Sequence, residues 1–204
     1  MPLSPIVRFV ISSITFGMLI LALPLGADEP FKPGPAASYA HQTSGPVTVG
    51  AKPYNKQELM ESAFGKKIDL LKYGVLPVLV VVENKGKEPV DLQNLEVSLV
   101  ASDGRHANAV SPDDLIHLGS PAKRPGIKQT PIPMPKKKNP MNSPEIVMRS
   151  FAAKMLPPGD SASGFFYFEA KSERGDKLYL NGMREARSGK DIMYFEFPLD
   201  EAGQ

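Results

Sequence analysis

The fold is decided by the stretch Leu76-Pro77-Val78-Leu79-Val80-Val81-Val82. Every position in it is apolar, and valine, whose branched side chain favours a strand, recurs through it. A strand without polar alternate positions is expected to be buried on both faces. The segment Asn84-Lys85-Gly86-Lys87 follows and predicts a turn.

Shorter strand signals lie on both sides of this stretch. Leu95, Val97 and Leu99 alternate with other residues, which is typical of a strand with one wet face. Asp103-Gly104 then predicts a hairpin turn. Phe and Tyr are concentrated between residues 165 and 197, so C-terminal strands should form much of the core. The remaining strands are expected at residues 47–49, 107–110, 164–170, 177–180 and 191–199.

Short helices are expected in the connections. Asn55 and Glu58 have capping-box spacing before an apolar face that ends at Gly65. A serine, a proline and two acids predict a second helix over residues 112–118. A third helix is expected from Ser143-Pro144, with an apolar face formed by Met148, Phe151, Ala152 and Met155.

Residues 1–27 have the pattern of a secretory signal peptide. Arg8 precedes an uncharged, mostly apolar run over residues 9–25, and Ala27 is a small residue before Asp28. Cleavage after Ala27 would export the protein, and an exported chain without Cys indicates a secreted or periplasmic bacterial protein. The alternative is an uncleaved anchor, because the run is at the short end for a spanning helix. Residues 28–46 are rich in Pro, Gly, Ala and Ser and predict an extended linker ahead of a domain over 47–204.

Residues 119–142 form a Pro-rich basic insertion in that domain. Six prolines, six basic residues and no acid predict a disordered loop. The chain carries a net charge of +2; without Arg8 and the +6 of this loop, the remainder is at −5. The loop is therefore the candidate site for an anionic partner, through Lys123, Arg124, Lys128, Lys136, Lys137 and Lys138.

Together these elements indicate a mostly β chain with few helices. Short strands separated by hairpin turns predict an antiparallel immunoglobulin-like β-sandwich with two or three short connecting helices. A small barrel is the alternative fold. The chain contains no Cys, so its core must be stable without disulfides.

Several segments carry a resemblance to a known group of proteins. The Val-rich strand ends in Glu83-Asn84 before a turn, Leu156-Pro157-Pro158-Gly159 introduces a Gly-then-aromatic strand at 163–168, and Tyr194-Phe195-Glu196-Phe197 follows. In these features the chain resembles small secreted bacterial proteins with an immunoglobulin-like domain of unknown function, over roughly residues 70–199. The resemblance implies an extracytoplasmic binding or scaffolding domain with no catalytic residues to carry over. The basic insertion departs from that pattern.

The possible catalytic groups do not form a recognisable motif. His117 follows Asp113 and Asp114 by four and three residues, which also suits a histidine at the negative end of a helix. Ser161 and Ser163 lie beside Gly164 but lack the strand–turn–helix setting of a nucleophile elbow. We therefore expect no enzyme activity and no catalytic, cofactor-binding or metal-binding residues.

The sequence thus predicts an exported, non-enzymatic binding or scaffolding protein of the bacterial cell envelope. Its expected partner is an envelope protein or an anionic envelope polymer or lipid, with no nucleic acid, and an edge strand could accept a partner strand. Contact with the membrane is expected only through an uncleaved N-terminal segment. Two alternatives stay open: a membrane-tethered accessory subunit of an envelope complex, and a secreted hydrolase that uses Asp113, Asp114 and His117.

Overall fold

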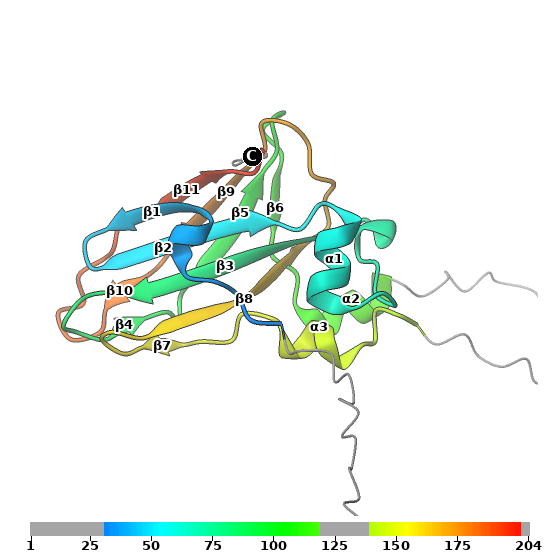
Figure 1. Cartoon of the computed structure of the whole chain (residues 1–204). Helices are drawn as coiled ribbons and strands as arrows, with labels where there is room; N and C mark the ends of the chain where they lie inside the picture. Colours follow the sequence, from blue (N-terminus) through cyan, green and yellow to red (C-terminus); the bar gives the residue numbers. More distant parts are fainter. Residues whose placement is uncertain (1–30, 119–138, 201–204) are drawn as a thin grey trace, which may run out of the picture. The chain divides into compact units, whose positions relative to one another are not determined.

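The structure is a computed structural model that describes residues 31–118 and 139–200 (Figure 1). The predicted signal peptide at 1–27, the start of the predicted linker and most of the basic insertion lie outside the described residues. All described residues belong to one compact unit.

The first sheet is antiparallel and has β3 near its centre. Its order is β1 (Ala40–Ser44), β2 (Val47–Pro53), β3 (Leu76–Asn84) and β8 (Ser161–Phe168). Val78, Val80 and Val82 of β3 belong to one buried cluster, and Leu79 and Val81 belong to a second. The prediction of a strand buried on both faces is confirmed.

The second sheet shares the first of these clusters. Its order is β11 (Phe195–Pro198), β9 (Lys177–Asn181), β5 (Glu96–Val100) and β6 (His106–Asn108), again antiparallel. The expected alternation in β5 is confirmed, since Val97 and Leu99 are buried and Ser98 is only partly so. A small third sheet of β10 (Arg184–Glu185), β4 (Val90–Asp91) and β7 (Met155–Leu156) contributes Val90 and Leu156 to the same cluster.

The helices pack on the other face of the first sheet. They are α1 (Gln57–Phe64), α2 (Pro112–Leu118) and α3 (Pro144–Met148), with 3-10 turns η1 (Ala36–Ser38) and η2 (Leu71–Tyr73). Met60, Leu115 and Ile146, one from each helix, join Phe165 and Tyr167 of β8 in the second cluster. The bounds predicted for α2 are confirmed.

The C-terminal aromatics form much of the core, as predicted: Phe165, Tyr167, Phe168, Phe195 and Phe197 are at most 1% exposed. The chain is mostly β, with antiparallel sheets and few helices. Within the described residues no ladder joins the first sheet to the second, so the alternative of a closed barrel is wrong.

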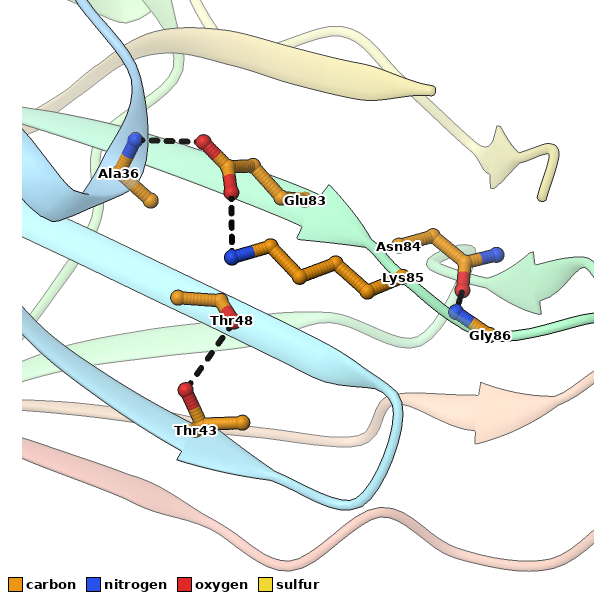
Figure 2. A network of polar contacts seen from close by, with 7 residues as sticks. All are labelled: Ala36, Thr43, Thr48, Glu83, Asn84, Lys85 and Gly86. Atoms are coloured by element: carbon orange, nitrogen blue, oxygen red, sulfur yellow. Dashed lines mark hydrogen bonds and ion pairs between the residues drawn. The ribbon is translucent and has the colours of Figure 1, made fainter. Parts of the chain in front are cut away.

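The linker expected at 28–46 is wrong for its described part. Residues 40–44 form β1, which pairs with β2 across a turn at Gly45. Ala36 of η1 is fully buried, and its backbone N–H donates to Oε1 of Glu83 at 2.7 Å (Figure 2). The segment gains its order from β2 and β3, which its own Pro-, Gly- and Ser-rich composition does not reveal.

The third helix is shorter than predicted. It ends at Met148, whose side chain is 73% exposed, instead of continuing an apolar face to Met155. The backbone beyond it runs along the edge of β8, where Phe165 N–H donates to Arg149 O and Phe151 N–H donates to Phe165 O. Gly164 permits this approach, because a Cβ there would lie 2.5 Å from the Phe151 backbone. Pairing with β8 therefore replaces the second half of the expected helix.

Candidate functional site

The polar side chains singled out in the sequence lie on the surface of two separate elements. Asp113, Asp114 and His117 are exposed on α2, and Ser161 and Ser163 are exposed on β8. Among residues 31–118 and 139–200, no group of three or more His, Cys, Asp or Glu side chains could hold a metal. The six basic residues proposed for an anionic partner, at positions 123–138, all lie outside the described residues.

A different arrangement occurs where the two large sheets meet edge to edge. β1 is an end strand of the first sheet, β11 is an end strand of the second, and the two lie side by side (Figure 1). We call this junction the seam. No backbone ladder crosses the seam in the described part of the chain.

One side chain bridges the seam by binding a backbone. The Gln42 amide donates from Nε2 to the carbonyl oxygen of Glu196, and Glu196 N–H donates to Gln42 Oε1 at 3.1 Å. A carboxamide carries the same donor and acceptor as a peptide group. Gln42 therefore satisfies the edge of β11 in the way that one residue of a neighbouring strand would.

The backbone of β11 explains why the seam does not close into a continuous sheet. Glu196 directs its N–H across the seam, and alternation in a strand places residue 198 on the same side. That residue is Pro198, which has no N–H to donate. Within β11, Glu196 is thus the one backbone donor presented to the seam.

Two grooves flank the bridge between Gln42 and Glu196. The larger has a volume of about 650 Å³ and is lined by η1, the start of β1, the end of β2 and α1, including Tyr39, Lys52 and Leu59. The smaller, of about 540 Å³, lies between the end of β1 and the segment before β11. Pro198 of β11 lines both grooves.

An exposed apolar pair lies at the rim of the smaller groove. Met193 is 70% exposed and Tyr194 is 60% exposed, and both line that groove. Large apolar side chains presented together to solvent are typical of a contact surface. The seam therefore combines backbone hydrogen-bonding groups, space and an apolar rim.

An ion pair lies beside the seam. Lys177 Nζ lies 2.7 Å from Glu196 Oε1, and this hydrogen bond holds the pKa of Glu196 below its usual value. The same contact raises the pKa of Lys177. Desolvation, and then a hydrogen bond to Glu196, raise the pKa of Tyr179. The Glu196 carboxylate is therefore held beside the seam by Lys177.

A polar network on the other side of β1 holds its hairpin in place. The Thr43 and Thr48 hydroxyls are 3.0 Å apart across β1 and β2 (Figure 2). Glu83 accepts from Ala36 N–H and pairs with Lys85 Nζ at 3.2 Å. These contacts fix β1 and η1, and with them one wall of the larger groove.

Sequence reasoning missed both residues of the bridge. Gln42 lies in the predicted linker, and the alternation of Glu196 with Phe195 and Phe197 indicates only a solvent-facing acid between buried aromatics. That interpretation suits its side chain, which is 33% exposed, but Glu196 contacts Gln42 through its backbone N–H and C=O. The available signal was Pro198, which marks an edge strand.

The chain has distant likenesses among solved structures. The yjhA protein of Bacillus subtilis is 14% identical, with 78% of this chain and 96% of that chain covered and a TM-score of 0.43. The ycdA protein of the same organism, described as a candidate lipoprotein, is 13% identical, with 80% of this chain covered and a TM-score of 0.39. This chain spans only 40% of its length.

The secreted protein MPT63 of Mycobacterium tuberculosis is 13% identical, with 80% of this chain and 95% of that chain covered and a TM-score of 0.34. No protein-family model matches the chain, and no curated protein matches it. In the described ranges, no helix is long and apolar enough to cross a membrane.

Proposed function

We propose that the protein is an exported, non-enzymatic binding or scaffolding protein of the bacterial cell envelope. The seam between β1 and β11 is its proposed binding surface. The observation that carries the proposal is the bridge between Gln42 and Glu196. In it the Gln42 side chain forms hydrogen bonds with the backbone of the β11 edge that faces the seam. The signal-peptide pattern at residues 1–27 supports export.

We further propose an immunoglobulin-like β-sandwich as the frame for this surface. Two antiparallel sheets of four strands contribute to one buried cluster, with Val78 and Val80 from one sheet and Leu178 and Leu180 from the other. Packed sheets hold their end strands rigidly. Such a frame suits a binding protein, because its recognition groups are then already in position.

The basic loop is proposed as a second contact, with an anionic polymer or lipid of the envelope. Each basic residue near an anionic surface contributes about 1 kcal/mol, less at high salt. At the base of the loop, Asn139 Nδ2 donates to Ile116 O at 2.7 Å, which ties the end of the loop to α2. The loop would therefore leave the domain at the helices, on the face of the first sheet away from the second.

Site-specific photocrosslinking in a bacterial host tests the proposal. A photoreactive residue is placed at Tyr194 on the seam or, as a control, at Met155, which is 45% exposed on β7. We expect a defined adduct from position 194 and none from position 155, with the mature chain found outside the cytoplasm. Equal adducts from both positions, or retention of the chain in the cytoplasm, would contradict the proposal.

A further inference from the structure

We propose that the seam binds one extended polypeptide segment of a partner, and that one residue of this segment, through its own N–H and C=O, replaces the Gln42 amide on the Glu196 backbone. This inference rests on the proposed function and names the chemistry of the partner. The partner is recognised as a strand, through its main chain first and its side chains second.

The hydrogen bonds at Glu196 carry the argument. Its N–H and its C=O both bind one planar amide, which is the pattern of a hydrogen-bonded pair in an antiparallel ladder. One residue of an incoming antiparallel strand presents an N–H donor and a C=O acceptor to the same two groups, from the peptide groups on either side of its Cα. Gln42 therefore holds the place that a strand residue would take.

Only one residue of β11 can form two backbone hydrogen bonds with an incoming strand, and this fixes the register of that strand. Because Glu196 N–H points into the seam, the N–H groups of Phe195 and Phe197 point toward β9, with which β11 is paired. Pro198 offers only a carbonyl on the seam side. An incoming segment thus finds one two-bond anchor at Glu196, which fixes how it must lie.

The available space suits an extended chain. The grooves on either side of the anchor are lined by residues 37–40, from η1 to the start of β1, and by residues 42–44 of β1. At about 3.3 Å per residue, eight extended residues span about 26 Å. Met193 and Tyr194 at the rim of the smaller groove would contact an apolar side chain near one end of the segment.

Gln42 also protects the edge while no partner is bound. An uncovered strand edge invites pairing with any other chain. A glutamine side chain satisfies the edge and, being attached through single bonds, can turn away when a strand arrives. We therefore expect Gln42 to compete with the partner, so that its removal strengthens binding.

The test uses the purified mature protein and a displayed library of eight-residue peptides. The selected peptide is titrated against the wild type and against Gln42→Ala, Glu196→Pro and Glu196→Ala. Both changes at 196 remove the ion pair with Lys177, but only proline removes the N–H that faces the seam. We expect binding about tenfold tighter for Gln42→Ala, little changed for Glu196→Ala, and at least tenfold weaker for Glu196→Pro.

A second measurement does not depend on how well Glu196→Pro folds. The selected peptide is N-methylated at one residue after another and titrated against the wild type. Loss of binding at the residue whose N–H faces the Glu196 carbonyl, with its two sequence neighbours unaffected, supports strand pairing, whereas indifference to every methyl group overturns it. Failure to select any peptide also overturns the inference. A dimer of this chain that Glu196→Pro dissociates overturns it too, because the seam would then pair with a second copy of the chain.

The inference and the proposed function can fail separately. A specific adduct from Tyr194 in cells supports the proposed function. If the affinity for the peptide is then the same in Glu196→Pro as in the wild type, the strand-pairing inference alone is overturned. Peptide binding that depends on the Glu196 N–H, without export or adducts in cells, supports the inference and contradicts the function.

Discussion

Ala36 lies directly on Gly50: a Cβ added to Gly50 would be 2.4 Å from the carbonyl oxygen of Ala36. A glycine inside strand β2 thus lets η1 pack on the sheet without an intervening side chain. Because η1 leads into β1, this contact helps to position the strand that forms one side of the seam.

Replacing Gly50 should therefore displace η1 and destabilise the domain. We expect Gly50→Ala to lower the free energy of unfolding by about 1–3 kcal/mol, the usual cost of overpacking. Gly34→Ala is the control, since the nearest atom to its Cβ would be Ser38 Oγ at 3.2 Å, the end of a small side chain. Urea denaturation measures both. Equal effects of the two changes would show that η1 is not held through Gly50.

The buried hydrogen bonds of Asn84 should contribute strongly to the stability of the domain. It is 1% exposed, its Nδ2 donates to carbonyl groups of Glu88, Leu156 and Pro157, and its Oδ1 accepts from Gly86 N–H. Asn84→Ala leaves these groups without a partner and should cost about 2–3 kcal/mol of unfolding free energy. Asn108→Ala, on the exposed edge of β6, should cost less than about 0.5 kcal/mol. A small effect at Asn84 would mean that water replaces its bonds.

The stability contributed by Glu83 should depend on pH. The hydrogen bond from Ala36 N–H, and then the contacts with Lys85, lower the pKa of this carboxyl below 4.5. A lowered folded pKa means that the contribution is complete above the unfolded pKa and is lost as pH falls through the folded value. Glu83→Gln should therefore lie below the wild type in unfolding free energy at pH 7, with a gap that narrows toward pH 3. A gap of constant size would contradict this account.

The bridge at the seam should be visible in amide hydrogen exchange. Gln42→Ala removes the acceptor for Glu196 N–H, so this amide should lose protection while the amides of Phe195 and Phe197 keep theirs. Because the bridge is exposed to solvent, the free energy of unfolding should fall by no more than about 1 kcal/mol. Unchanged exchange at residue 196 would mean that Gln42 does not hold this edge.

Local patterns in the sequence predicted those strands and helices whose own residues specify them. The apolar run at Leu76–Val82 and the serine, proline and acids around Pro112 each specify their element without help from distant residues, and both appear where expected. The strand Ala40–Ser44 has no apolar run or alternation, and its order comes from β2. Sequence reasoning therefore placed the core and missed the strand at its edge.

The seam could not be predicted for a related reason. Gln42 and Glu196 are 154 positions apart, and their contact uses the side chain of one and the backbone of the other. No spacing rule connects such a pair, because only the packing of the two sheets brings β1 beside β11. The basic residues of the loop, which the sequence favoured as a site, lie outside the described residues, and their role stays a proposal.

The most direct test of the central claim is the yield of the Tyr194 photoadduct in cells that produce Glu196→Pro or Glu196→Ala. The account predicts that the adduct persists at close to the wild-type yield with alanine and falls at least tenfold with proline, because only proline removes the backbone donor of the seam. Equal yields from the two variants would contradict the claim that the partner binds the Glu196 backbone.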